Sequence, residues 1–338
     1  MPGNHVLTSD ALEATTRTYA AGRRPSLKVR ALINLRAGTA MELCPEAMRD
    51  LIAQAFAAEG HRIEVDILPP ENLDQAIADA ARSDIDVLVV GGGDGTIRTA
   101  ATHLMGTDKT LGILPLGTMN RLAKDLEIPL DLASAARYLA TATPSRIDVA
   151  KVNGRVFLCN SLMGLTLRYS LARARLRGKP ATQRLPAYFA TLREILSSKD
   201  KISITVDHGE DRMRLRALSV AVTNNGYDET MTWLRRPRLD GGKLTMYVSK
   251  HRSGWGLAMA IGRALLGRWK GDPEMAKFTG ESFVIRTPRR VKRLANDGEI
   301  SKFETPLRYE ICPRALAVLT HSAEPDSTEP HDAAPQSA

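Results

Sequence analysis

The stretch "VVGGGDGTIR", Val89–Arg98, places four glycines around one acid directly after an apolar run. Glycines at a strand-to-helix junction let the backbone approach a phosphate closely, and the following helix offers free N–H groups and the positive end of its dipole. A carboxylate in the same loop should repel a phosphate. Asp94 is tolerable there if a divalent cation lies between the two groups, or if it serves as a general base for an incoming hydroxyl.

The sequence of this loop does not match two standard phosphate-binding motifs. The Walker loop requires a lysine after its glycines, and none follows here. The dinucleotide fingerprint GxGxxG requires Gly or Ala where Thr96 stands. A purely structural turn would not need four glycines in five positions, because each one costs conformational entropy on folding. The loop therefore indicates phosphate binding of another kind, in which Thr96 caps the following helix or donates to a phosphate.

The segments around the loop alternate between strand and helix patterns. The expected strands cover residues 27–35, 61–68, 85–90 and 111–116, and the expected helices cover 44–60, 71–83 and 96–105. Strands that alternate with helices predict an open, mostly parallel sheet flanked by helices, with ligands bound at the carboxyl ends of its strands.

From about Arg146 the pattern changes to antiparallel β. Asn153-Gly154 lies between two alternating runs, which is the strongest short hairpin signal. Further strands are expected as a pair within 201–225 around His208-Gly209, and at 243–250, 282–287 and 307–312, with helices near 186–197 and 254–266. We expect a flexible leader (1–26), an α/β domain (27–145), a mainly antiparallel β-sandwich domain (146–320) whose last strand is free to return to the first domain, and a disordered tail (321–338).

The overall composition is that of a globular protein with a basic surplus. The 338 residues are 43% hydrophobic and carry a net charge of +9, which attracts nucleotides, nucleic acids or acidic lipid headgroups. The three cysteines, Cys44, Cys159 and Cys312, form no metal or disulfide pattern. No signal peptide and no apolar run of about 18 residues is present, so we expect a cytoplasmic protein with at most peripheral membrane contact.

Several motifs, in order, resemble the diacylglycerol kinase catalytic-domain family, which includes bacterial lipid kinases and the sphingosine and ceramide kinases. "GGGDGT" is followed about twenty residues later by "LPLGTMNRLAKDL". Similar segments elsewhere are "INLRAG", "IDVAKVNGRVFLCNSLMG", "PRLDGGKL" and "NDGEI", so the resemblance spans about residues 28 to 320. NAD kinases and phosphofructokinases carry similar glycine loops, but the later segments favour lipid kinases.

The resemblance implies roles for particular residues. ATP would be bound by Asn34, Gly38, Gly92, Gly93, Gly95, Thr96 and Thr118, and Asp94 would act near Mg²⁺ and the transferred phosphoryl group. Asp240 would bind a second, structural Mg²⁺, although a turn residue before two glycines is an equally simple explanation. Asp297-Gly298 is also expected to form a hairpin turn. Glu299 would be the general base or else an ordinary strand residue, and Asp94 competes with it for the role of base. Arg98 replaces a residue that is commonly Asn, and adds a cation near the phosphates.

Two basic stretches remain to be explained. Arg168–Arg193 contains seven Lys or Arg and no acid, and Arg286–Arg293 contains five more. They form either a solvated face or a surface attracted to anionic phospholipid, worth about 1 kcal/mol per basic residue. The apolar side chains interleaved with the first stretch could reach the acyl boundary; they are Leu171, Leu176, Leu185, Tyr188 and Phe189.

Taken with the resemblance, these features predict an ATP- and Mg²⁺-dependent lipid kinase that phosphorylates the hydroxyl of a lipid such as diacylglycerol. Its expected partners are the lipid substrate and an anionic membrane surface, and a homodimer is compatible with the sequence. One alternative is a NAD kinase-type phosphotransferase with a soluble acceptor. Another is a non-enzymatic, basic nucleotide- or nucleic-acid-binding regulator, but aromatic residues are only 5% and no nucleic-acid-binding signature is present, so no specific nucleic acid is expected.

Overall fold

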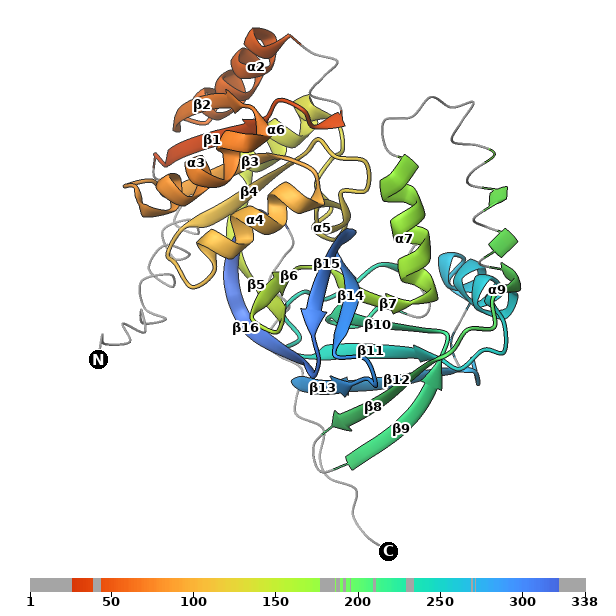
Figure 1. The fold of residues 1–338 in the computed structure, drawn as a ribbon. Helices are drawn as coiled ribbons and strands as arrows, with labels where there is room; N and C mark the ends of the chain where they lie inside the picture. Colours follow the sequence, from red (N-terminus) through yellow and green to blue (C-terminus); the bar gives the residue numbers. More distant parts are fainter. Residues whose placement is uncertain are drawn as a thin grey trace, which may run out of the picture.

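The computed structural model describes residues 26–38, 44–176, 186, 189–190, 193–194, 196–208, 211–228, 234–268, 270 and 272–321. The expected leader, apart from Ser26, and the expected tail, apart from His321, lie outside these residues. So does much of the helix expected near 186–197. The described chain forms an α/β region and a β-rich region that adjoin along one side (Figure 1).

The α/β region is built on four parallel strands. They are β1 (Lys28–Asn34), β2 (Arg62–Leu68), β3 (Val87–Gly92) and β4 (Thr110–Pro115), in the order β2-β1-β3-β4. The helices are α2 (Pro45–Ala58), α3 (Pro70–Arg82), α4 (Asp94–Leu104) and α6 (Leu132–Thr141), of which α2 packs with α6 and α3 with α4 (Figure 1). All residues of β3 and β4 are buried, because helices cover both faces of the sheet.

The last strand returns to the first domain. β16 (Leu307–Thr320) pairs in parallel with β4 near its end and antiparallel with β5 (Thr143–Val152) along its length. The boundary expected near residue 145 therefore falls inside β5, and one sheet of ten strands runs through both regions. A short helix that the sequence pattern did not indicate, α5 (Arg121–Asp125), follows β4.

The β-rich region is a sandwich of two sheets. The ten-stranded sheet also contains β6 (Arg155–Phe157), β8 (Ile202–His208), β9 (Asp211–Ala217) and β13 (Ser282–Arg286). The second sheet is antiparallel and contains β7 (Asn160–Gly164), β10 (Ser219–Asn224), β11 (Leu244–Ser249), β12 (Met275–Gly280), β14 (Val291–Asn296) and β15 (Glu299–Glu304). A second apolar core, which includes Phe157, Val222 and Phe283, is formed by both sheets. The expected fold class is thus confirmed.

Two tight hairpins follow the sequence signals closely. Asn153-Gly154 joins β5 to β6 with φ values of 46° and 77°, and Asp297-Gly298 joins β14 to β15 with 49° and 85°. Two central residues with positive φ define the turn type that matches the twist of paired strands. Two paired strands, β8 and β9, lie on either side of His208-Gly209 as expected, but the range 201–225 holds a third strand, because the chain leaves β9 at Ala217 and enters the other sheet as β10 at Ser219.

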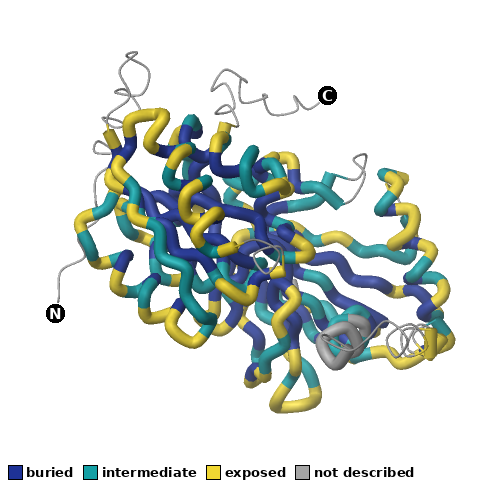
Figure 2. The backbone as a smooth tube through the Cα atoms, turned by 90° about the horizontal axis from the view of Figure 1, so that it is seen from above, coloured by how far each residue is buried: buried dark blue, intermediate teal, exposed yellow. Residues whose placement is uncertain are grey.

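Two helices, α7 (Leu165–Leu176) and α9 (Gly254–Leu265), lie beside the second, antiparallel sheet (Figure 1). Seen from above, buried backbone fills the middle of both regions and exposed turns surround it (Figure 2). Among the described residues, no helix has the length and apolar character needed to cross a bilayer. Cys44, Cys159 and Cys312 are all free.

Candidate active site

Three strand ends of the parallel sheet meet at one edge. Asn34 ends β1, Gly92 ends β3, and the loop after β4 begins at Leu116. A Cβ atom added to Gly117 would lie 2.5 Å from the Cα of Gly93, so the loops after β3 and β4 are in direct backbone contact. The Asn34 amide donates to Thr96 Oγ1 at 3.3 Å, which ties β1 to the same place. Carboxyl ends of adjacent parallel strands are where ligands of such sheets bind.

The glycine loop leads straight into α4. The helix begins at Asp94, and its N-cap residue, Gly93, has no capping side chain. Thr96 is the third residue of the helix and accepts from Asn34, so the expectation that Thr96 caps the helix is wrong. An uncapped helix start leaves first-turn N–H groups available to an anion, as phosphate binding requires.

The other residues expected at the nucleotide site lie around this edge. A Cβ on Gly92 would lie 2.6 Å from Thr96 Cβ, and one on Gly38 would lie 3.5 Å from the carbonyl oxygen of Leu116. Thr118 follows Gly117 and is exposed. The structure therefore brings the predicted nucleotide-binding residues to one surface.

Asn120 shapes the loop after β4. It adopts the left-handed conformation (φ 48°), its Oδ1 accepts from Gly117 N at 2.9 Å, and its Nδ2 donates to the carbonyl oxygens of Pro115 and Gly117. The next residue, Arg121, donates its backbone N–H to Asp94 Oδ1 at 2.7 Å. One short loop thus fixes the carboxylate of Asp94. The sequence motif contained this asparagine, but its structural role was not recognised.

The hairpin of β14 and β15 reaches the start of α4 from the second domain. The Glu299 carboxylate occupies the space that a Cβ on Gly95 would need, and it forms an ion pair with Arg98. Arg98 also donates to the carbonyl oxygen of Asn296 at 3.2 Å. Two carboxylates from distant parts of the chain, Asp94 and Glu299, therefore both lie at the first turn of α4: Asp94 as its first residue, and Glu299 against Gly95. The Glu299 side chain is 53% exposed, so an incoming hydroxyl can reach it.

Asp297, the first residue of the hairpin turn, has a separate structural role. Its buried carboxylate accepts from the backbone N–H groups of Leu158, Cys159 and Asn160 at 2.7, 2.8 and 3.1 Å. Burial raises the pKa of Asp297, and the three backbone donors oppose this effect. These bonds attach the hairpin to the chain that enters β7, and so they set where Glu299 lies. Sequence reasoning treated Asp297 only as a turn residue.

The structure does not join Asp240 to the glycine loop. Its carboxylate pairs with Arg238 Nε at 3.4 Å, and in the described part of the chain it has no hydrogen bond or ion pair with the loop residues. The glycine turn after it is held by Asp148, a fully buried residue that the sequence analysis missed. Asp148 accepts from Gly242 N at 2.7 Å, Asn225 Nδ2 at 3.0 Å and Arg314 N at 2.8 Å.

A buried ion pair connects α5 with the second domain. Arg236 Nη2 lies 2.6 Å from Asp125 Oδ2, with side chains only 1% and 10% exposed. The same guanidinium donates to the carbonyl oxygens of Leu158 and Asn224 at 2.7 and 2.8 Å. Desolvation is the largest influence and opposes the charge of Arg236, but Asp125, together with Cys159 and Tyr227, raises the pKa of the guanidinium overall. This pair fixes the loop that precedes Asp240 next to the candidate site.

The overall fold is shared with solved structures. A diacylglycerol kinase from Bacillus anthracis strain Sterne superimposes with a TM-score of 0.67 at 22% identity, covering 87% of this chain and 97% of that one. A second structure from the same organism gives a TM-score of 0.70 at 21% identity, over the same shares of the two chains. At these identities the likeness shows the fold alone, which is the two-domain fold of the diacylglycerol kinase structures.

The sequence comparisons give the family. Residues 28–152 match the family model described as "Diacylglycerol kinase catalytic domain". "Putative lipid kinase SH2167" of Staphylococcus haemolyticus is 28% identical over 70% of this chain and 77% of its own length. "Probable lipid kinase YegS-like" of Klebsiella pneumoniae is 41% identical over 26% of this chain and 30% of its own length. The comparisons thus place residues 28–152 among diacylglycerol kinase catalytic domains and support a lipid kinase.

Proposed function

We propose that this lipid kinase transfers the γ-phosphoryl group of ATP to the hydroxyl of a lipid such as diacylglycerol, in a reaction that depends on Mg²⁺. The observation that carries the proposal is that Asp94 and Glu299 both lie at the first turn of α4. A phosphate-binding surface and two carboxylates with separate anchors lie there together. Phosphoryl transfer needs chiefly such positioning and electrostatic stabilisation.

The ATP phosphates would bind at the loops after β3 and β4. The backbone contact between Gly93 and Gly117 keeps this surface free of side chains. The first-turn N–H groups of α4 would donate to the phosphate oxygens. Asn34 and Thr118 border the surface from the neighbouring strand ends and would contact the nucleotide.

The carboxylate oxygens beside the glycine loop fit one Mg²⁺ better than two. Mg²⁺ is commonly held by one or two carboxylates together with substrate phosphates, and Asp94 is placed to be such a ligand. When bound, the ion would neutralise charge on the transferred phosphoryl group. Asp240 remains the proposed ligand of a second, structural Mg²⁺, but Arg238 would have to release its ion pair for a cation to bind there. Within the described residues, no three His, Cys, Asp or Glu side chains form a metal-binding group.

We assign the role of base to Glu299. The oxygen of the lipid hydroxyl forms a bond to the γ-phosphorus while the bond from that phosphorus to the β–γ bridging oxygen breaks. ADP leaves with the electron pair of that bond, and the hydroxyl proton passes to the Glu299 carboxylate. Arg98 holds Glu299 in position, while Asp94 is fixed by the backbone of Arg121.

Labelled ATP and a panel of lipids in mixed micelles test this assignment, with NAD as the soluble control acceptor. Asp94→Asn should abolish lipid phosphorylation. Glu299→Gln should lower kcat by about 10²–10⁴-fold, the usual contribution of a general base, while a nucleotide analogue still binds. Full activity of Asp94→Asn, or labelling of NAD without labelling of any lipid, would contradict the proposal.

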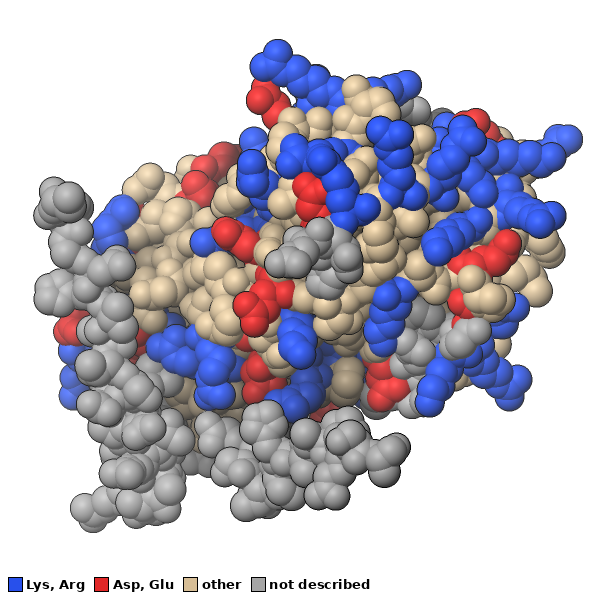
Figure 3. Space-filling view, turned by 90° about the horizontal axis from the view of Figure 1, so that it is seen from below, with Lys and Arg blue, Asp and Glu red and all other residues tan. Residues whose placement is uncertain are grey.

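A lipid acceptor requires contact with a membrane surface, and we propose that an anionic bilayer docks near α9. Trp255, Met259 and Leu266 expose 60%, 50% and 65% of their surface there, and Phe189 exposes 69% and lines a shared hollow with Trp255. Leu185 and Tyr188, which were also expected to reach the bilayer, lie outside the described residues. On the face seen from below, Lys and Arg crowd the half that the β-rich region forms (Figure 3). Apolar side chains with basic neighbours suit the interface of an anionic membrane.

Trp255→Ala/Met259→Ala should weaken binding to vesicles that contain phosphatidylglycerol, and unchanged binding would exclude this docking face.

A further inference from the structure

Arg121 reaches the candidate site with its side chain as well as with its backbone. It is the first residue of α5, directly after the left-handed Asn120, and it is half-buried. Its backbone N–H lies 2.7 Å from Asp94 Oδ1, so the start of its side chain is fixed beside the glycine loop. Any group that binds between Asp94 and the second domain is therefore within the neighbourhood of this arginine.

The guanidinium of Arg121 has no protein partner. Among the residues that the structure describes, none accepts a hydrogen bond from it and no carboxylate forms an ion pair with it. Two other arginines close to this junction differ in this respect. Arg98 pairs with Glu299, and Arg236 pairs with Asp125 at 2.6 Å. Arginine is rarely withdrawn from water without a partner, because the loss of solvation of its charge is costly.

The groups around this guanidinium belong to the second domain. Burial is the largest influence on the pKa of Arg121 and lowers it, but nearby groups raise it overall. These groups are Tyr227, Cys159 and Asp297, and the charge of Arg236 acts against them. A phenol and a thiol are uncharged at neutral pH, and burial raises the pKa of Cys159 further. The Asp297 carboxylate already accepts from three backbone N–H groups. The positive charge is therefore only partly compensated by the protein.

The side chain extends from one carboxylate of the site towards the other. The backbone of Arg121 is held at Asp94, and Asp297, which acts on its guanidinium, lies two residues before Glu299 in the hairpin. In the proposed reaction the γ-phosphoryl group is transferred between Asp94 and Glu299. A guanidinium carries parallel N–H donors that fit two oxygens of one phosphate, and it keeps its charge at every physiological pH.

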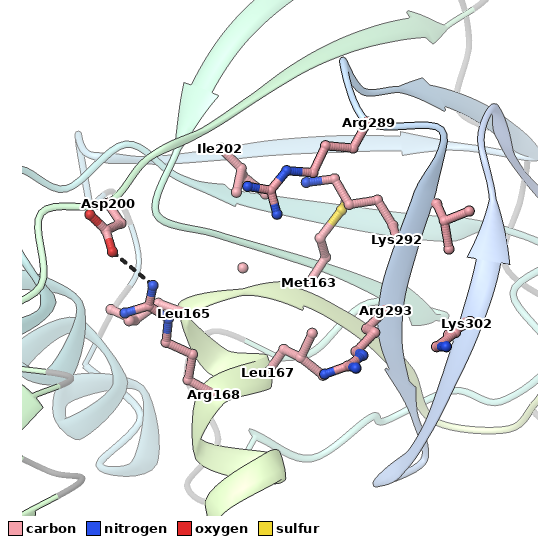
Figure 4. Close-up of a pocket in the computed structure, with 12 residues that line it drawn as sticks. Met163, Leu165, Leu167, Arg168, Asp200, Ile202, Arg289, Lys292, Arg293 and Lys302 are labelled. Carbon is pink, nitrogen blue, oxygen red and sulfur yellow. Dashed lines mark hydrogen bonds and ion pairs between the residues drawn. The ribbon is translucent and has the colours of Figure 1, made fainter.

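Another group of cations near the hairpin is placed differently. A basic hollow of about 370 Å³ lies between α7 and the β14–β15 hairpin, and Arg293 and Lys302 are among its lining residues (Figure 4). These two residues are directly paired across the hairpin, so their side chains share one face. Lys302 is three residues after Glu299, which places it about 10 Å along the strand and on the opposite face. These cations are therefore not positioned to meet the phosphoryl group at Glu299.

We propose that Arg121 binds the γ-phosphoryl group of ATP and stabilises the negative charge on it during transfer. This inference rests on the proposed function and adds to it a cation that neither the glycine loop nor the two carboxylates supply. Arg121 gives and takes no proton in the reaction. Its contribution is electrostatic and positional, as in other phosphoryl transfers that place an arginine on the transferred group.

The first test measures equilibrium binding of ADP and of β,γ-methylene ATP to the full chain in the presence of Mg²⁺. The variant is Arg121→Gln. The matched control is Lys124→Gln, which removes one positive charge from an exposed position of the same helix. Arg121→Gln should bind the ATP analogue at least about tenfold more weakly than the wild type, with ADP affinity within about twofold, because only the analogue carries a γ-phosphate. Equal weakening for both nucleotides, no weakening for either, or the same change in Lys124→Gln would overturn the proposal.

The second test separates catalysis from folding. The kcat of Arg121→Gln for lipid phosphorylation should fall by about 10²–10³-fold, the usual cost of losing one group that stabilises transition-state charge. Arg121→Lys keeps the charge without the paired donors and should recover part of this loss. The Tm of Arg121→Gln should equal or exceed that of the wild type, because a half-buried charge without a partner is removed. A lower Tm with an unchanged kcat would instead make Arg121 a structural residue.

The outcomes distinguish this inference from the proposed function. If the wild type phosphorylates no lipid but Arg121→Gln alone loses affinity for the ATP analogue, the lipid acceptor is wrong and the role of Arg121 stands. If the wild type phosphorylates lipid and Arg121→Gln retains both its kcat and its affinity for the analogue, only the role of Arg121 is overturned.

Discussion

The carboxylate of Glu299 fills the space directly beside Gly95, so that a Cβ atom at residue 95 would force this carboxylate to move. Gly95 is the second residue of α4 in the first domain, and Glu299 opens β15 in the second. The glycine next to Asp94 therefore leaves room for the second carboxylate. This relationship makes the relative placement of the two domains part of the active site.

Gly95→Ala should inactivate the enzyme without unfolding it. The new methyl group would displace the Glu299 carboxylate, whereas alanine inside a helix is favourable by up to about 1 kcal/mol relative to glycine. We expect lipid phosphorylation to fall by about 10²-fold with an unchanged or higher Tm. Thr102→Ala, at an exposed position of the same helix, is the control and should keep wild-type activity. An active Gly95→Ala enzyme would show that Glu299 does not act from this position.

Arg98→Ala should affect turnover more than stability. Arg98 connects α4 to both Glu299 and the carbonyl oxygen of Asn296, but the ion pair is partly exposed and worth no more than about 1 kcal/mol. We expect kcat to fall by about 10–100-fold, since the carboxylate loses its anchor. Arg98→Lys retains the charge and should recover part of this loss. Equal kcat values for wild type and Arg98→Ala would mean that the pair does not position the base.

Asp297 should behave as a structural residue. Asp297→Ala leaves three buried N–H groups without their acceptor, which should lower the free energy of unfolding by about 2–5 kcal/mol. Asp297→Asn keeps one acceptor oxygen and should cost less. Denaturant unfolding gives the free energy of unfolding of both variants. Glu299→Gln, an exposed position two residues away, is the control. A fully stable but inactive Asp297→Ala would instead indicate a direct part in the reaction.

The buried pair of Arg236 and Asp125 should be needed for the domains to hold together. Arg236→Ala leaves Asp125 without its partner and removes the donors to the carbonyl oxygens of Leu158 and Asn224, so we expect a loss of about 3–5 kcal/mol. Arg235→Ala removes only a partly exposed ion pair with Glu127 and should cost less than about 1 kcal/mol. Similar unfolding midpoints for the two variants would contradict the proposed role of the buried pair.

Features encoded by local pattern were predictable from the sequence. The order of strands and helices in the first domain followed from hydrophobic periodicity, and the two hairpin turns followed from Asn153-Gly154 and Asp297-Gly298. The switch between sheets at Leu218 was missed, because two strands that run on without turn residues look like one. The short helix α5 was also missed, since five residues carry too little periodicity to be recognised.

The sequence by itself determined the glycine loop and its place at a strand end, because glycine spacing and apolar runs act over neighbouring residues. It also supplied Asp94 and Glu299 as candidates through resemblance. Only the tertiary structure decided that Glu299 lies against Gly95, that Arg98 pairs with Glu299, and that Asp240 pairs with Arg238. The two contacts of Glu299 depend on how the hairpin of the second domain docks on the first, and that docking is set by buried groups such as Asp297 and Arg236, whose partners lie far away in the chain.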